Sequence, residues 1–168
     1  PAQALEDLTA RLRSDLRRAR RRAEAIGAVS FMVHAPSTIT ELAPLWERSL
    51  RVEAAGWKGR SRTALRFDER VGAFYRAYAI RACEQGILRI LFLEIGTAVA
   101  ATMIALETSG RFWILKIGYD EDLARCSPGM LLLREALGHA AAHRARSFEL
   151  LGTASEWTRR WTDREEEM

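Results

Sequence analysis

The chain has 168 residues, of which 48% are hydrophobic and 29% are charged, and its net charge is +4. This length and composition predict one globular domain that is large enough to fold without disulfides or metals. No apolar run approaches the length of a membrane span. Because the chain starts at Pro1 and stops in an acidic run, we expect residues 1–168 to be a single domain cut from a longer protein.

The first predicted element is a basic amphipathic helix within residues 1–27. Apolar residues recur every three or four positions from Leu5 to Ile26, and Gly27 ends the pattern. The other faces carry seven arginines: Arg11, Arg13, Arg17, Arg18, Arg20, Arg21 and Arg22. We interpret them as a solvated face, and the alternative is a surface for RNA phosphates or an anionic membrane. The segment lacks aromatic residues on which bases could stack, which argues against RNA.

Two more helices and a strand follow. Residues 29–34 read as a strand, and Thr38 with Glu41 forms a capping box for a helix to about Glu53. A loop with glycines on both sides of Trp57 and Lys58 comes next. Asp68 then caps a helix that Gly86 ends. Its predicted inward face is Val71, Phe74, Tyr75, Tyr78 and Ala82, and Cys83 is expected in the core.

The middle of the chain changes to strand-like periodicity. Residues 87–94, 98–107 and 111–119 are three apolar runs joined by short turns, which allow only antiparallel neighbours. A helix from Ser127 follows, and residues 147–151 form a short strand that this helix carries back to the sheet. A last helix is predicted within residues 154–161. The order of elements predicts an α/β fold with a mixed sheet.

The start of the helix at Ser127 is the first candidate site. Ser127 is a good N-cap, Pro128 a good first residue, and Gly129 removes a side chain where free backbone N–H groups point outward. Such a helix start attracts anions, and Arg125 would add a charged contact. The alternative is an ordinary capped helix. Neither a P-loop nor a dinucleotide-binding pattern is present.

Several stretches together resemble a known family: "LRRARRRAEAIGAVSF", "EAAGWKG…TAL", "FYR" and "LKIGYDEDLARCSPGMLL". In order and spacing they are similar to the GNAT superfamily of acyl-CoA N-acyltransferases. The residues in these stretches resemble those of the FemAB/CelD-like branch, which is found in cellulose and exopolysaccharide biosynthesis proteins. The resemblance implies a GNAT-like mixed sheet with a central antiparallel meander. The last two strands of that sheet are missing here, so another domain or protomer is expected to complete it.

The resemblance implies a cytoplasmic enzyme that transfers an acyl group from acetyl-CoA or another acyl-CoA directly to a small-molecule amine, without a metal. The pyrophosphate would rest on the helix start with Arg125 beside it, and the strand before the helix would splay from residues 147–151 to admit the pantetheine arm. Gly118 inside that strand fits a bulge or a close backbone approach. The residues implied in donor binding are Ile117, Gly118, Arg125, Ser127, Pro128, Gly129 and Met130.

Direct transfer needs a base for the amine and an acid for the leaving thiolate. Glu53 is the candidate base, with a solvated helix end as its alternative, and Tyr119 is the candidate acid. Asp120 either orients an acceptor or caps the loop. Lys116 either faces the acceptor cleft or extends from an outward face. The remaining expected site residues are Lys58 as a catalytic residue and Trp57 and Glu156 as acceptor contacts.

The chain departs from the family pattern after the last strand. Glu156 remains, but Trp157 and Thr158 stand where a Tyr and a Lys are expected. This leaves two alternatives to an acyl-CoA enzyme: a Fem-like transferase that uses aminoacyl-tRNA, and a degenerate GNAT domain that binds without catalysis.

Cys126 and the pair His139 and His143 are weaker candidates for a nucleophile and a metal site. Cys126 lies in a loop where it could be exposed, but no His with an orienting acid is adjacent, so a nucleophilic role is disfavoured. His139 and His143 are one helical turn apart and could supply two metal ligands, but the sequence offers no evident third. We interpret them as adjacent surface histidines and expect no metal.

Overall fold

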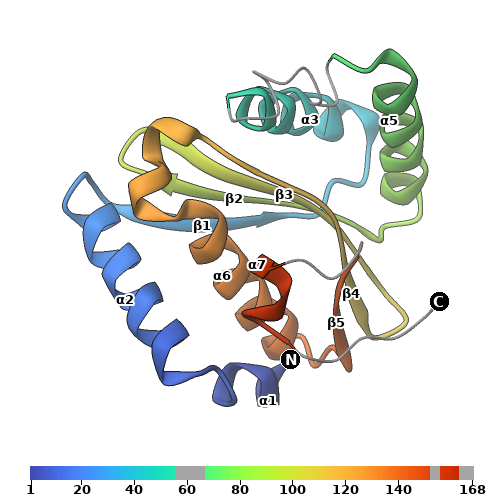
Figure 1. The fold of residues 1–168 in the computed structure, drawn as a ribbon. Helices are drawn as coiled ribbons and strands as arrows, with labels where there is room; N and C mark the ends of the chain where they lie inside the picture. Colours follow the sequence, from blue (N-terminus) through green and yellow to red (C-terminus); the bar gives the residue numbers. More distant parts are fainter. Residues whose placement is uncertain (56–66, 152–155, 163–168) are drawn as a thin grey trace.

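The computed structural model describes residues 1–55, 67–151 and 156–162, and a five-stranded mixed sheet forms its centre (Figure 1). The strands are ordered β1-β2-β3-β4-β5; the first four are antiparallel neighbours and the last pairs in parallel. Their bounds are β1 Val29–His34, β2 Leu88–Ile95, β3 Ala98–Thr108, β4 Arg111–Tyr119 and β5 Ser147–Leu150. The predicted α/β fold class and central meander are therefore confirmed.

Helices cover both faces of this sheet. In Figure 1, α2 and α6 lie on one face, and α3 and α5 lie on the other. The bounds are α1 Ala2–Glu6, α2 Ala10–Glu24, α3 Ile39–Ala54, α5 Glu69–Glu84, the 3₁₀ helix η1 Glu121–Cys126, α6 Pro128–Ala142 and α7 Glu156–Arg159. Among the helices that the structure describes, none combines the length and apolar character needed to cross a membrane.

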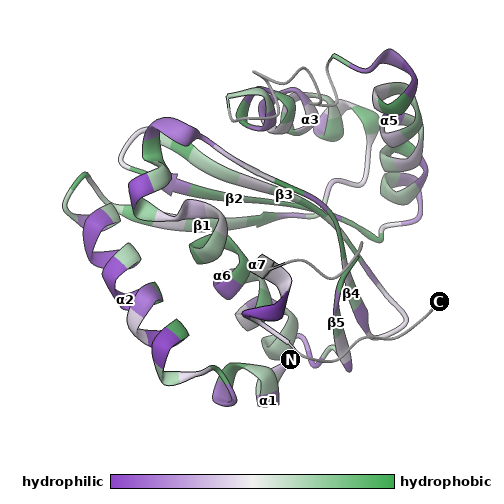
Figure 2. Cartoon of the chain, viewed as in Figure 1, coloured by the Kyte–Doolittle hydropathy of each residue, from purple (hydrophilic) through white to green (hydrophobic). Residues whose placement is uncertain are grey.

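The alternation of side chains along the strands produces two separate cores. Leu91 and Leu93 of β2 pack with Leu132 of α6, whereas Ile90 and Phe92 pack on the opposite face against α3 and α5. Successive side chains of a strand point to opposite faces, so a strand buried on both sides must be apolar throughout. Figure 2 shows mostly hydrophobic colour along β2 and β3, while α2 carries hydrophilic residues on its outer side.

The N-terminal segment forms two helices, so the prediction of one continuous helix is wrong. Thr9 is extended between α1 and α2, and its hydroxyl accepts a hydrogen bond from the Leu12 N–H at 3.1 Å. The guanidinium of Arg13 donates to the carbonyl oxygens of Glu6 and Leu8. A threonine cap therefore restarts the helix. The leucine spacing continues across this break because Leu8 still packs into the same core.

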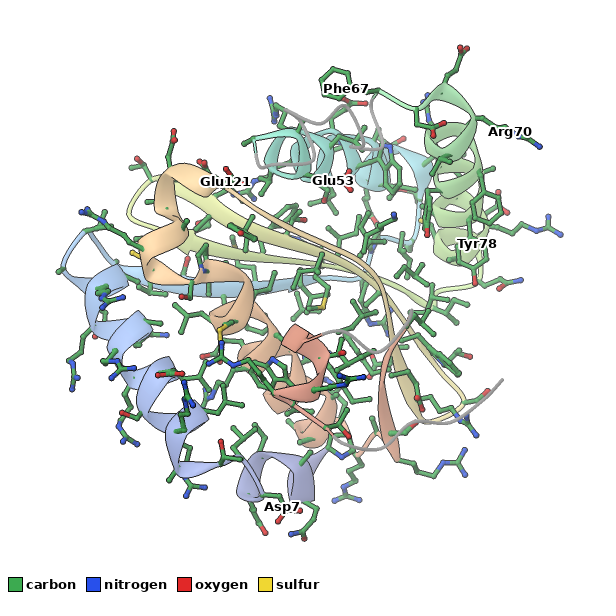
Figure 3. All side chains as sticks on the ribbon, in the orientation of Figure 1. Asp7, Glu53, Phe67, Arg70, Tyr78 and Glu121 are labelled. Atoms are coloured by element: carbon green, nitrogen blue, oxygen red, sulfur yellow. The ribbon has the colours of Figure 1, made fainter. Side chains whose placement is uncertain are left out.

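The helix α5 begins as predicted, since the Asp68 carboxylate accepts from the Val71 N–H at 2.9 Å. Its predicted inward face is partly wrong. Ala79, Ala82 and Cys83 are the buried residues. The larger side chains Val71, Phe74 and Tyr78 are exposed, and Figure 3 shows Tyr78 on the outer side of α5. The stripe of small residues lets the helix approach the sheet closely, which leaves most of the aromatic stripe on the outside.

A pH dependence of stability follows from His34 in β1. Its ring lies edge-on to Phe92, with centroids 5.7 Å apart, and burial lowers its pKa below 6.5. Nearby Arg48 lowers the pKa further, while Glu94 opposes the shift. Because the unfolded chain takes up this proton at a higher pH than the native chain does, stability is lost as the pH falls below about 6.5.

We predict that His34→Gln weakens the loss of unfolding free energy between pH 7.5 and pH 5.5. Urea unfolding at the two pH values measures the slope, and a proton NMR titration of the His34 ring in the unaltered chain should give a midpoint below 6.5. A midpoint above 6.5, or equal slopes in the two proteins, would contradict the assignment.

Candidate active site

The strand β4 is paired with β5 over only part of its length. The parallel ladder runs from Arg111↔Ser147 to Ile114↔Leu150, which covers four of the nine residues of β4. Beyond it, β4 continues to Tyr119 in register with β3. All four residues of β5 take part in this ladder, so the pairing ends midway along β4 where β5 itself ends.

A bulge lies in β4 at the end of this ladder. Ile104 pairs with Lys116 and Ala105 pairs with Ile114, so Leu115 is an extra residue in β4. A bulge bends a strand and increases its twist. Of the two alternatives expected for Gly118, the bulge is therefore found at Leu115 instead.

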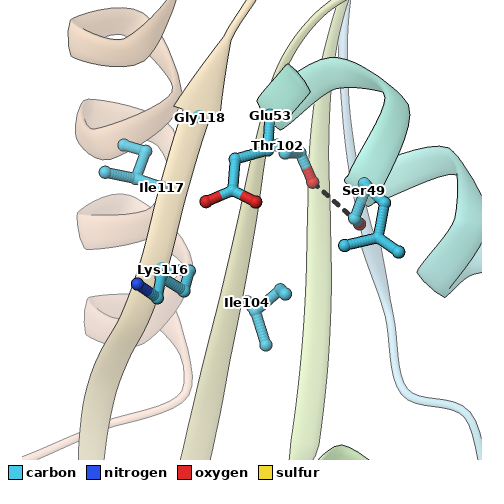
Figure 4. Close-up of a pocket in the computed structure, with 8 residues that line it drawn as sticks. Ser49, Glu53, Thr102, Ile104, Lys116, Ile117 and Gly118 are labelled. Carbon is cyan, nitrogen blue, oxygen red and sulfur yellow. Dashed lines mark hydrogen bonds between the residues drawn. The ribbon is translucent and has the colours of Figure 1, made fainter. Parts of the chain in front are cut away.

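Gly118 has the other function expected of it, which is a close approach of two backbones. A Cβ atom placed on Gly118 would lie 3.0 Å from Cα and 3.2 Å from Cβ of Glu53, so the C-terminal end of α3 rests directly on β4. Glu53 is only 5% exposed. The alternative of a solvated helix end is therefore wrong for this residue. In Figure 4 its carboxylate extends from α3 over the β3–β4 side of the sheet.

The Glu53 carboxylate lies in a small pocket between α3 and the sheet (Figure 4). The pocket has a volume of about 10 Å³ and is lined by Ser49, Leu50, Glu53, Thr102, Ile104, Lys116, Ile117 and Gly118. That volume holds about one water molecule. The buried Thr102 hydroxyl donates to the Ser49 hydroxyl at 2.9 Å. The pocket therefore joins a buried acid to an internally bonded hydroxyl pair.

Lys116 lies on the same face of β4 as this pocket. Its ammonium group is 4.7 Å from the centroid of the Tyr75 ring on α5, a distance typical of a cation–π contact. The side chain therefore points toward the α3–α5 side, as the first of its two interpretations requires.

The start of α6 differs from the predicted cap. Ser127 has the left-handed φ of 47°, and its side chain makes no capping hydrogen bond. Its N–H donates to the Ala124 carbonyl at 2.9 Å, and the Met130 N–H donates to the Ser127 carbonyl at 3.0 Å. Pro128 has no N–H. Of the four residues expected to hold a diphosphate, Gly129 is thus the one whose N–H has no partner in the described part of the chain.

The Tyr119 side chain packs against the N-terminal end of α6. A Cβ atom on Gly129 would lie 3.4 Å from Cδ1 of Tyr119, so the aromatic ring packs beside the glycine. Tyr119 packs with the α2–α6 core, whereas the adjacent Gly118 contacts α3 on the opposite face. The structure therefore does not bring Tyr119 and Glu53, the expected acid and base, to one face of the sheet.

The loop between β4 and α6 is held by its own polar groups and by α2. The Asp120 carboxylate accepts from the Asp122 N–H at 3.0 Å, which matches the capping interpretation of this residue. The Arg125 side chain is exposed, and the Arg125 carbonyl accepts a hydrogen bond from Nη1 of Arg22 at 3.1 Å. Sequence reasoning missed Arg22 here, because nothing in its spacing indicates a contact 103 residues away.

Other expected residues lie elsewhere. Trp57 and Lys58 fall outside the described residues. Glu156 is the first residue of α7, and its side chain is not described. Cys126 is fully buried in the α2–α6 core, so the expectation that it could be exposed is wrong.

A family model described as "Acetyltransferase (GNAT) domain" matches residues 10–159. The chain belongs to this family. A comparison with curated proteins gave no match. The family assignment makes the chain an N-acetyltransferase that uses an acyl-CoA donor and a small-molecule acceptor.

The contact at Gly118 predicts an asymmetry between two glycines of this GNAT domain. Gly118→Ala places a methyl group against the α3 backbone and should lower the unfolding free energy by about 1–3 kcal/mol. Gly138→Ala in α6, where a Cβ would meet nothing within 4 Å, should raise it by about 0.5–1 kcal/mol. Urea unfolding of both variants checks this. Full stability of Gly118→Ala would show that α3 does not rest on β4 there.

Proposed function

We propose that this GNAT enzyme binds acyl-CoA where β4 and β5 cease to pair and acylates an amine that reaches Glu53 from the α3 side. The observation that carries the proposal is the end of the β4–β5 ladder at Ile114, followed by the bulge at Leu115. A pantetheine arm carries amide groups that can bond to a strand edge, as an added strand does. We further propose that the enzyme is cytoplasmic and acts in the FemAB/CelD-like branch, on a cell-envelope or exopolysaccharide amine.

The start of α6 supports a diphosphate position at the end of the same strand. The Gly129 N–H is available, and a helix N-terminus carries a partial positive charge that favours anions. Exposed Arg125 and the nearby Arg22 guanidinium add positive charge at this end of the loop. Donor binding would then extend from Leu115 along β4 to Gly129.

Glu53 supports the acid–base part of the proposal. Its buried carboxylate would accept a proton from the amine as the nitrogen attacks the thioester carbonyl. The new C–N bond forms, the C–S bond breaks, and CoA leaves as a thiolate that takes up a proton. A backbone N–H near the bulge would stabilise the oxyanion. Tyr119 as the acid and Lys58 as a catalytic residue stay predictions.

The contacts of α2 favour an acyl-CoA donor over aminoacyl-tRNA. Arg18 pairs with Asp15, Arg20 pairs with Glu24 at 2.7 Å, and Arg22 bonds to the loop before α6. These arginines already have partners within the protein, so an extended surface for RNA phosphates would have to compete with them.

A pair of glycine substitutions tests the donor site. Gly129→Glu puts a carboxylate at the proposed diphosphate position and should weaken acetyl-CoA binding by tenfold or more. Gly138→Glu introduces the same charge further along α6 and should leave the affinity unchanged. Calorimetric titration measures both, and circular dichroism verifies the fold. Equal affinities in the two variants would remove Gly129 from the donor site.

A second substitution tests the base. Glu53→Gln should reduce turnover by about 10²-fold or more while acetyl-CoA affinity stays within twofold, because the loss falls on proton transfer. Glu47→Gln, on the exposed side of α3, is the matched control. Release of the CoA thiol is followed with a panel of amino sugars, amino acids and lipid amines. If Glu53→Gln retains the rate of the control, another group is the base.

A further inference from the structure

The C-terminal end of α6 carries a cluster of three ligand-forming side chains. His139 lies in α6, His143 is the C-cap residue just after it, and Glu107 comes from the end of β3. One ligand atom from each lies within 4.8 Å of the others. No third ligand is evident from sequence spacing because Glu107 is 32 residues from His139 along the chain, and only the packing of α6 on β3 brings them together.

The hydrogen bond of His143 leaves a ring nitrogen suited to a metal. Nδ1 of His143 is 2.9 Å from the carbonyl oxygen of His139. Since a carbonyl oxygen can only accept, Nδ1 carries the proton, and Nε2 of the neutral ring has a free lone pair. Histidines that bind metals are oriented in this way, by a carbonyl or carboxylate on the other nitrogen.

His139 contributes a buried nitrogen that has no hydrogen-bond partner among the described residues. Its Nε2 lies 3.8 Å from the nearer oxygen of Glu107, which is too far for a hydrogen bond. The His139 and His143 rings lie side by side with their centroids 4.0 Å apart. Buried polar atoms without a partner are uncommon in proteins, and such an atom beside a carboxylate and a second imidazole points to a missing ligand.

We propose that Glu107, His139 and His143 bind a divalent transition-metal ion such as Zn²⁺. Two imidazoles and one carboxylate suit zinc, cobalt or nickel better than magnesium or calcium, which prefer oxygen ligands. Bond lengths of about 2.0–2.2 Å put neighbouring ligand atoms about 3.4 Å apart. Nε2 of His139 and Oε2 of Glu107 are 3.8 Å apart and all three ligand atoms lie within 4.8 Å of one another, so the side chains must move closer together to bind one ion. Solvent would complete the coordination, since His143 is exposed.

Arg89 bonds to one ligand of this site and leaves room for a metal ion. Its Nε donates to Oε2 of Glu107 at 2.7 Å. Carboxylates that bind metals are commonly held by such outer hydrogen bonds, and Oε2, the oxygen 3.8 Å from His139, has a second lone pair for an ion. The adjacent positive charge is expected to reduce the affinity for a cation.

The metal site is separate from the acyl-transfer chemistry. Gly129 and His139 are ten residues apart on one helix, which is about 15 Å at 1.5 Å per residue. A metal here would join the last turns of α6 to β3. The metal would fix the C-terminal end of α6, whereas the N-terminal end of α6 is the proposed donor site. Because the two ends are far apart, metal binding and acyl-CoA binding can be tested independently.

The test is titration of the untagged chain with Co²⁺, followed by visible absorption, and displacement of Co²⁺ by Zn²⁺. We expect one equivalent to bind, and Glu107→Gln, His139→Gln and His143→Gln each to weaken binding at least tenfold. His34→Gln, which alters the one histidine outside the cluster, should leave the affinity unchanged. Circular dichroism identifies any variant that fails to fold, and His143→Gln, at an exposed position, keeps the test valid in that case.

Three outcomes would overturn the proposal. They are no binding at millimolar Co²⁺, equal affinity in the unaltered chain and all three cluster variants, or a loss caused by His34→Gln as large as theirs. The last two would mean adventitious binding only. Because the readout is metal binding, these outcomes are independent of acetyl-CoA affinity and of turnover.

Discussion

The contact of Glu53 with Gly118 is the constraint on which the proposed active site depends. Because Gly118 has no side chain, the end of α3 lies directly against the backbone of β4. Cα of Glu53 is 3.0 Å from the position that a Cβ on Gly118 would occupy. This contact buries the Glu53 carboxylate in the pocket between α3 and the sheet and directs it over β4 beyond the bulge. A carboxylate in that position can act on a group held at the strand edge, which a solvated helix end could not do selectively.

The residues proposed to take part in the reaction lie on different faces of the sheet. Glu53 and Lys116 lie on the α3–α5 side, whereas Tyr119 and Gly129 lie on the α6 side. A donor lying along the edge of β4 would be reachable from both. This separation explains how one strand could hold a charged diphosphate and an uncharged amine nucleophile without placing the Glu53 carboxylate beside the phosphates.

Local signals predicted the elements well, and long-range packing accounts for what they missed. The apolar runs of β2–β4 with their short turns and the caps at Thr38 and Asp68 are short-range features, and the structure has them as expected. Glu53 was expected as the base from the family resemblance, but its burial depends on Gly118, 65 residues away. The position of the bulge and the partner of Arg22 are set by strand register and helix docking, which no local pattern encodes.

The most direct test of the donor assignment is hydrogen–deuterium exchange with and without saturating acetyl-CoA. The account predicts slower exchange for the amides of residues 115–119, 127 and 129–131, where the donor would lie, and unchanged exchange for β1 and α5. Protection confined to other segments, or none despite measured binding, would contradict the placement of acyl-CoA between β4 and the start of α6.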